Sequence, residues 1–137
     1  MVLPRGMARS VCVIVPSVGN HAELGIALDG LLSQTYPEVD VVVVGPERDE
    51  GRLVSESRGI RYIDDEGSMT RADACNVALR ETESELVLFT DDDVIVPKDW
   101  VENLVRWFDR DEVAGVGGPN FAPPDAVSYT HLTLPTT

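Results

Sequence analysis

The hydrophobic residues of this chain gather in short runs, and the stretches between the runs carry apolar residues at helical spacing. The runs are rich in β-branched residues and do not alternate with polar ones. Such runs are typical of strands that are buried on both faces of a parallel sheet. The predicted strands are Val11–Val15, Val39–Val44, Ile60–Ile63, Leu86–Thr90 and Val113–Val116.

Two helices are predicted between the first three strands. Asn20 followed by Glu23 resembles a capping box that begins the first helix, and Tyr36-Pro37 ends it. A weaker helix is predicted over about Asp49–Ser57. The apolar positions of the first helix are Leu24, Leu28, Leu31 and Leu32.

Two further helices are predicted on either side of the fourth strand. One runs over about Thr70–Glu81, and the other opens at Asp99 with an acidic partner, Glu102, three residues on. The expected apolar positions of the former are Ala72, Val77, Ala78 and Leu79. Those of the latter are Trp100, Leu104, Trp107 and Phe108.

Strands that alternate with helices through short connections predict an α/β fold with a doubly wound, mostly parallel sheet. Right-handed crossovers then bring the loops at the carboxyl ends of the strands to one edge of the sheet, where ligands bind. The loops expected at this edge are 16–20, 45–50, 64–70, 91–93 and 117–120.

The chain divides into three parts by composition. Residues 1–9 form a short N-terminal extension, and residues 10–126 form one domain. Charges vanish after Ala126, and residues 127–137 resemble a translated sequencing adapter, so they are set aside together with Tyr129 and His131. We therefore expect the natural protein to continue past Ala126, which makes the domain truncated.

The chain is acidic, with 24 Asp and Glu against 11 Lys and Arg among 137 residues, a net charge of −13. Such a surface repels nucleic acid and anionic lipid, so neither is an expected partner. No apolar run approaches the ~20 residues that a membrane-spanning helix needs. Cys12 and Cys75 show no metal or redox spacing and are expected to be buried thiols, which favours the cytoplasm.

Three consecutive aspartates, Asp91, Asp92 and Asp93, directly follow a buried strand. Their mutual repulsion favours a compensating cation, and Mg²⁺ or Mn²⁺ takes a few carboxylates alongside substrate phosphates. Such a metal would neutralise a diphosphate and ease its departure. A solvated turn is the alternative interpretation. A calcium loop is disfavoured because no Gly or Glu follows at EF-hand spacing.

Several segments, taken in order, resemble family 2 glycosyltransferases of the GT-A fold, which is Rossmann-like. The resemblance covers about residues 11–119, and it implies that residues 10–126 form the nucleotide-sugar-binding part of the domain. The segments that carry it are Val13–Pro16, Leu31–Pro37, Arg71–Ala78, Phe89–Asp93, and Pro97 with Trp100.

The resemblance assigns the acidic triplet to the metal and the donor ribose. By position, Asp93 is the first choice as metal ligand, Asp91 shares the metal or faces the ribose, and Asp92 belongs to the donor site. Pro16 and Ser17 are implied to line the nucleotide pocket, and the resemblance also implies a wall near the sugar at residues 117–119, for which a tight turn is the alternative.

Arg71 and Asn76 lie on the helix whose start is implied to approach the donor. Arg71 would supply a cation near the phosphates or the base. The alternatives are an exposed helix charge for Arg71 and, for Asn76, a buried amide that ties loops together. His21 falls in the first turn of a helix, where a lone histidine is more often incidental.

The sequence departs from the family pattern in two places. Family members carry an Asp that recognises the base at the end of the second strand, whereas Gly45 follows that strand here, with Glu47 or Asp49 as substitutes. The family's catalytic base lies well downstream of the metal motif, so we expect it beyond Ala126. No residue of this chain is assigned as general base.

The implied activity is transfer of a sugar, hexosyl or related, from a nucleotide-diphosphate sugar to an acceptor, with inversion and with Mg²⁺ or Mn²⁺ as cofactor. The acceptor is a saccharide, a lipid-linked molecule or a protein. The chain alone is expected to be inactive, and the parent to lie in the cytoplasm or at the cytoplasmic face of a membrane through further sequence.

Two other functions remain open. One is a nucleotidyltransferase, although residues 16–20 lack the basic residues expected in its first loop. The other is a degenerate, non-catalytic interaction domain, which the missing Asp after Val44 supports.

Overall fold

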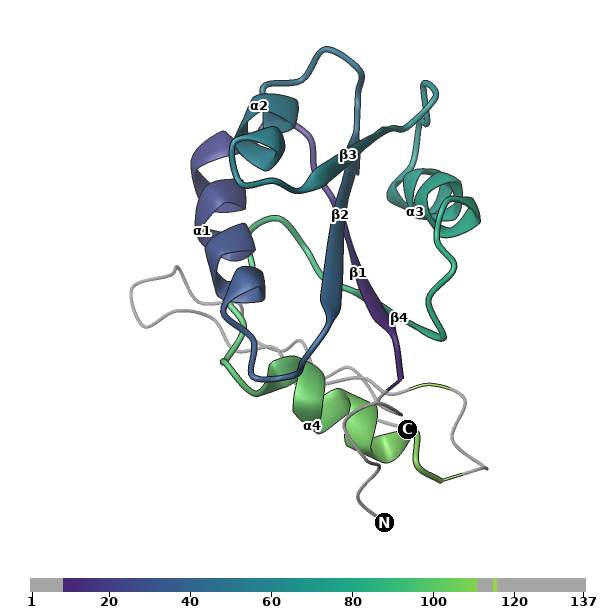
Figure 1. The fold of residues 1–137 in the computed structure, drawn as a ribbon. Helices are drawn as coiled ribbons and strands as arrows, with labels where there is room; N and C mark the ends of the chain where they lie inside the picture. Colours follow the sequence, from purple (N-terminus) through teal and green to yellow (C-terminus); the bar gives the residue numbers. More distant parts are fainter. Residues whose placement is uncertain (1–8, 111–114, 116–137) are drawn as a thin grey trace, which may run out of the picture.

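Four parallel strands form the centre of the structure, a computed structural model that describes residues 9–110 and Gly115. The strands are β1 (Val11–Pro16), β2 (Val39–Gly45), β3 (Arg61–Asp64) and β4 (Leu86–Phe89), in the order β3-β2-β1-β4. This confirms the predicted α/β fold with a parallel sheet (Figure 1). The predicted strand at 113–116 apart from Gly115, the wall at 117–119, residues 1–8 and the tail at 127–137 lie outside the described residues.

The helices cover both faces of the sheet. They are α1 (His21–Leu32), α2 (Gly51–Glu56), α3 (Arg71–Arg80) and α4 (Trp100–Trp107). In Figure 1, α1 and α2 lie on one side of the strands and α3 lies on the other. The chain therefore builds β1 to β3 with helices on one face and crosses the opposite face to reach β4.

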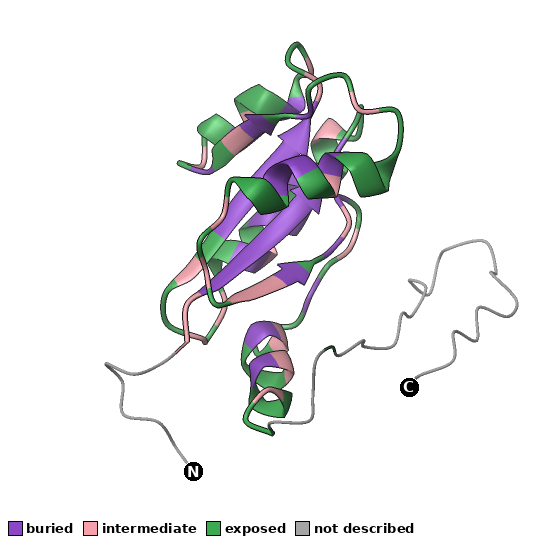
Figure 2. Cartoon of the chain, turned by 90° about the vertical axis from the view of Figure 1, so that its right-hand side faces the viewer, coloured by how far each residue is buried: buried purple, intermediate pink, exposed green. Residues whose placement is uncertain are grey.

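The central strands are buried on both faces, as Figure 2 shows. Along β1, Val11, Val13 and Val15 pack into the core with α1 and α4, while Cys12 and Ile14 pack into the core with α3. Because successive side chains of a strand point to opposite faces, both cores need apolar residues. The unbroken apolar runs of the sequence follow from this double burial.

The first helix begins after Asn20 as predicted, but it lacks the predicted side-chain cap and ends earlier. The side chain of Asn20 makes no capping hydrogen bond, because it contacts Asp92 instead. The helix ends at Leu32, before Tyr36, since the Ser33 hydroxyl and the Gln34 amide donate to the carbonyls of the last turn. The predicted capping box is therefore wrong.

The two later helices occur where they are predicted, with differences in their buried faces. Thr70 caps α3 by accepting from the Asp73 backbone N–H at 3.1 Å, whereas Asp99 makes no side-chain cap of α4. The buried residues of α3 are Ala74, Val77 and Ala78, so Ala72 and Leu79 are exposed. In α4 the buried residues are Val101 and Val105. Short helices bury only the narrow stripe that faces the sheet.

The strand order places a topological switch point between β1 and β4. The connection after β1 runs over one face of the sheet, and the connection that leads to β4 runs over the other. In open parallel sheets the crevice at the carboxyl ends of such a strand pair is the usual ligand site. The loops after Pro16 and Phe89 leave the sheet at this point.

Candidate functional site

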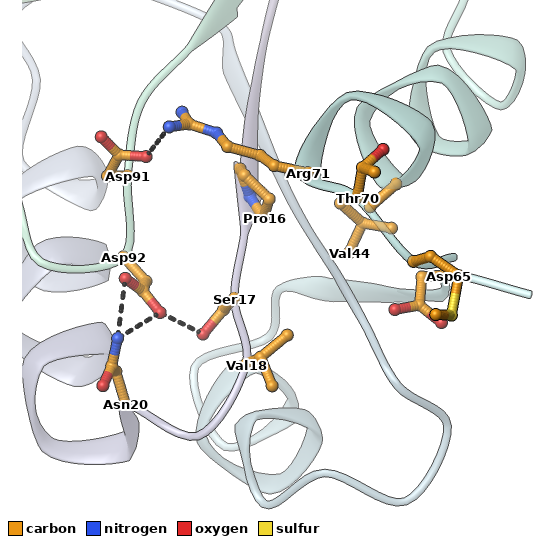
Figure 3. A pocket seen from close by; sticks show the side chains of 12 residues that line it. Pro16, Ser17, Val18, Asn20, Val44, Asp65, Thr70, Arg71, Asp91 and Asp92 are labelled. Atoms are coloured by element: carbon orange, nitrogen blue, oxygen red, sulfur yellow. Dashed lines mark hydrogen bonds and ion pairs between the residues drawn. The ribbon is translucent and has the colours of Figure 1, made fainter. Parts of the chain in front are cut away.

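A cavity of about 290 Å³ lies at the carboxyl ends of the strands. Its walls come from the loop after β1, the end of β2, the β3–α3 connection with the first turns of α3, and the loop after β4 (Figure 3). This is the edge of the sheet at which the sequence predicts ligand binding. The lining residues are Pro16, Ser17, Val18, Asn20, Val44, Asp65, Met69, Thr70, Arg71, Ala74, Asp91 and Asp92.

Asp92 is the buried member of the acidic triplet, with 8% of its surface exposed. The Ser17 hydroxyl donates to its Oδ2 at 2.9 Å, and the Asn20 amide donates to both oxygens at 3.2 and 3.3 Å. A buried carboxylate that receives three hydrogen bonds from one loop holds that loop in place. Asp92 thus joins the loop after β1 to the loop after β4.

Asp91 and Asp93 are more accessible than Asp92. Asp91 is partly exposed, lines the pocket and forms an ion pair with the Arg71 guanidinium. Asp93 is exposed and does not line the pocket. The residue that the sequence ranks first as metal ligand therefore lies outside the cavity wall, and Asp91 lies within it.

The carboxylate oxygens at this site fit a divalent cation such as Mg²⁺ or Mn²⁺ that takes its remaining ligands from a bound molecule. Within residues 9–110, no three His, Cys, Asp or Glu side chains form a group that could hold a metal ion by themselves. Mg²⁺ and Mn²⁺ are commonly held by one or two carboxylates plus phosphate oxygens and water. Asp91 and Asp93 offer oxygen donors of this kind, and Asp91 already attracts a cationic group, Arg71.

The end of β2 has no room for a side chain. A Cβ on Gly45 would lie 2.3 Å from the Ser17 carbonyl oxygen and 2.5 Å from the Tyr62 hydroxyl. The Ser17 N–H donates to the Val44 carbonyl at 2.9 Å, and the Tyr62 hydroxyl donates to the Pro46 carbonyl at 2.7 Å. Burial, followed by nearby aspartates, raises the pKa of Tyr62, which keeps this donor protonated. This close packing around Gly45 therefore explains why no aspartate stands at the end of β2.

The residues that the sequence offers as substitutes do not line the pocket. Glu47 is exposed. Asp49 accepts hydrogen bonds from the backbone N–H groups of Gly19 and Gly51, at 3.3 and 3.0 Å, so it ties two loops together. His21 lies beside this group, with its Nε2 3.3 Å from a Glu50 carboxylate oxygen.

Asn76 also lies outside the pocket lining, on the exposed part of α3. Its predicted alternative role as a buried amide is therefore wrong. Both cysteines are free thiols: Cys12 is buried, and burial raises its pKa to about 11, while Cys75 is half-buried with a pKa that burial also raises.

Seven lining residues were not singled out as site residues from the sequence. Asn20 was read as a helix cap and Thr70 as the start of a helix, while Val18 and Met69 have ordinary apolar side chains. Asp65 is 5% exposed although it sits in a polar turn, and only its place after a predicted strand could have pointed to it. The seven residues are Val18, Asn20, Val44, Asp65, Met69, Thr70 and Ala74.

Comparison with known proteins gives a consistent set of relatives. The model of the family "Glycosyl transferase family 2" matches residues 12–135. The glycosyltransferase GlyA of Streptococcus pneumoniae serotype 4 is 31% identical over 102 residues, which is 70% of this chain and 14% of that protein. The chain therefore spans about one seventh of this curated relative.

Solved structures agree in fold. The mannosyltransferase PcManGT from Pyrobaculum calidifontis, in complex with GDP-Man and Mn²⁺, superposes with a TM-score of 0.70 at 30% identity, covering 82% of this chain and 36% of that one. S. aureus TarS in complex with UDP-GlcNAc gives 0.64 at 26% identity, covering 81% of this chain and 37% of that one. None of the helices in the described part of this chain has the length and apolar character that a membrane span requires.

Proposed function

This chain belongs to glycosyl transferase family 2, and we propose that it forms the part of a metal-dependent, inverting glycosyltransferase that holds the nucleotide-diphosphate-sugar donor. The single observation that carries the proposal is the pocket at the switch point, where Asp91 and Arg71 face each other beside a loop that Asp92 holds in place. A cation site and a fixed guanidinium in one cavity suit a diphosphate.

The relatives support this choice of ligand. The Pyrobaculum mannosyltransferase was solved with GDP-Man and Mn²⁺, and TarS was solved with UDP-GlcNAc. We therefore take the donor to be a nucleotide-diphosphate sugar and the cofactor to be Mg²⁺ or Mn²⁺. The chain spans little more than a third of these structures, so the transfer reaction is proposed for the whole protein.

Each site residue has a separate task in this proposal. Asp91 and Asp93 hold the divalent cation, which when bound supplies charge compensation for the leaving diphosphate. Arg71 donates hydrogen bonds to the donor phosphates once these compete for it with Asp91. Asp92 acts indirectly: it holds in place the loop that carries Ser17. The backbone of that loop lines the nucleotide side of the pocket.

We assign no general base to this chain. The base that deprotonates the acceptor hydroxyl is proposed to come from sequence beyond Ala126, and the chain alone is proposed to bind the donor without transferring its sugar. The acceptor is a saccharide, a lipid-linked molecule or a protein. The free thiols Cys12 and Cys75 support a cytoplasmic location, including the cytoplasmic face of a membrane.

Calorimetric titration of the purified chain with UDP and GDP, with and without Mn²⁺, tests the proposal. We expect binding to be at least tenfold tighter with Mn²⁺, and this difference to disappear in Asp91→Asn and to shrink in Asp93→Asn. Asp40→Asn is the matched control, because Asp40 is exposed near the amino end of β2 and the change removes the same charge. Binding that is indifferent to Mn²⁺ would contradict the metal roles.

A further inference from the structure

Asp65 gives the pocket a second acidic end. It follows β3 directly, and in Figure 3 it lies on the opposite side of the pocket from Asp91 and Asp92. Only 5% of its surface is exposed. Its backbone N–H donates to the Gly45 carbonyl at 2.9 Å, which fixes the residue against the end of β2.

One carboxylate oxygen of Asp65 accepts a hydrogen bond from the protein and the other does not. Oδ1 accepts the Gly67 backbone N–H at 3.1 Å, while Oδ2 has no hydrogen-bond partner among the described residues. Among the buried side-chain nitrogen and oxygen atoms of the described residues, only His21 Nδ1 lacks a partner, so Oδ2 of Asp65 keeps contact with solvent. This accessible oxygen belongs to a residue that lines the pocket and is otherwise held by the protein, so it is suited to accept a hydrogen bond from a ligand.

Two apolar side chains belong to the same cavity. Val18 is 64% exposed and Met69 is 92% exposed, and both line the pocket. Exposed apolar groups beside a few fixed polar atoms are characteristic of sites for planar organic ligands. A ring that bonds to Asp65 would therefore also cover apolar surface that the protein otherwise leaves in water.

The pocket offers no other carboxylate for this task on the β2–β3 side. Gly45 has no space for a side chain, and Glu47 and Asp49 lie outside the lining. The remaining carboxylates of the lining are Asp91, which pairs with Arg71, and Asp92, which Ser17 and Asn20 already satisfy.

We infer that Asp65 reads the base of the donor nucleotide by accepting its ring N–H at Oδ2. A carboxylate only accepts hydrogen bonds, so it selects a base that presents a donor at this position. Guanine and uracil carry a ring N–H there, whereas adenine and cytosine carry a bare ring nitrogen that would face the carboxylate with repelling lone pairs. The inference rests on the proposed function and adds the class of donor base to it.

Binding of four nucleotides to the unmodified chain is the first test. With Mn²⁺ present, we expect UDP or GDP to bind at least tenfold tighter than CDP and ADP, the size of one charge-assisted hydrogen bond lost. Equal binding of all four nucleotides would overturn the role of Asp65 but leave the proposed function standing. If none of them binds, the proposed function fails and this inference falls with it.

Asp65→Asn is the second test, because the amide oxygen can still accept from Gly67 while the amide nitrogen replaces Oδ2. We expect the preference for UDP or GDP over CDP and ADP to fall at least tenfold. Asp64→Asn is the matched control: Asp64 is exposed on the same turn, accepts the Glu66 N–H at 2.9 Å and carries the same charge. A purely structural role would change all four affinities together, and an unchanged ratio in folded Asp65→Asn overturns the assignment.

Discussion

The two sides of the pocket differ in how far their polar groups are already paired within the protein. On the β1–β4 side, Asp92 receives hydrogen bonds from Ser17 and Asn20, and all three residues belong to one network. On the β3–α3 side, Asp65 keeps an oxygen without a partner among the described residues, and Met69 is exposed.

The difference separates residues that build the site from residues that remain available to a ligand. A network whose members satisfy one another rigidifies the backbone that carries it. Groups that lack protein partners gain most when a ligand arrives, since their hydrogen bonds are still to be made. We therefore expect changes within the Asp92 network to affect stability, and changes to the more accessible Asp91 or on the β3–α3 side to affect binding.

Gly45→Ala should have the largest effect on stability, because Gly45 at the end of β2 packs against the Ser17 loop of the β1–β4 side. The new Cβ would overlap the Ser17 carbonyl oxygen, a backbone atom that cannot move without shifting the loop. We expect a loss of about 3 kcal/mol in the free energy of unfolding, at the upper end for overpacking. Urea denaturation followed by circular dichroism measures it.

Gly30→Ala is the control for this substitution. Its Cβ would meet only the Val96 carbonyl oxygen at 3.7 Å, an ordinary contact, within α1. Alanine is favoured over glycine in a helix by ~0.5–1 kcal/mol, so this variant should be slightly more stable. Equal losses in both variants would contradict the close approach at Gly45.

Asp92→Ala and Asp93→Ala separate two neighbours in the triplet. Removing the Asp92 carboxylate leaves the buried Ser17 hydroxyl and the Asn20 amide without their acceptor, so we expect a loss of about 2 kcal/mol in stability. Asp93 is exposed, and its removal should change stability by less than ~0.5 kcal/mol. Comparable losses would contradict the division of roles, and urea denaturation again gives the comparison.

The sequence predicted the described part of the fold well because double burial leaves a strong signal. Runs such as Val41 to Val44 face two cores, so their apolar character marks the strands without structural information. The carboxyl-end rule then located the pocket edge, including Pro16, Ser17, Asp91 and Asp92, and the family resemblance added Arg71.

The details that failed depend on contacts between distant segments. Asn20 has the sequence signature of a helix cap, but Asp92, 72 residues away, competes for its side chain. Asp65 and Asp93 are both aspartates in turns, but Asp65 is held against the end of β2 and buried, whereas Asp93 is exposed. Local propensity carries no information about such choices.

Arg71→Ala tests the β3–α3 side of the pocket, where Arg71 begins α3. The pair with Asp91 is partly exposed, so its loss should change stability by less than ~0.5 kcal/mol. Loss of a guanidinium that bonds to the donor phosphates should weaken UDP or GDP binding about tenfold. Arg80→Ala is the matched control, since Arg80 lies on the same helix, pairs with exposed Glu66 and does not line the pocket. Equal effects of both variants on affinity would remove Arg71 from the site.

Asp29→Asn measures how much an ion-paired carboxylate outside the pocket contributes to stability. The hydrogen bond from Arg58 lowers the pKa of Asp29 below its ordinary value of about 4. A carboxyl group whose pKa is lowered by folding stabilises the protein above its unfolded pKa, and this contribution disappears as the pH falls through the folded pKa. We therefore expect the variant to be slightly less stable at pH 6, and the two stability curves to converge as the pH falls through the folded pKa of Asp29. Both residues of the pair lie outside the pocket lining, so nucleotide affinity at pH 7 should not change.

A gap between the two stability curves that persists or widens in acid would show that Asp29 stabilises α1 by something other than its charge. A change in nucleotide affinity would mean that the pocket responds to ion pairing anywhere in the fold.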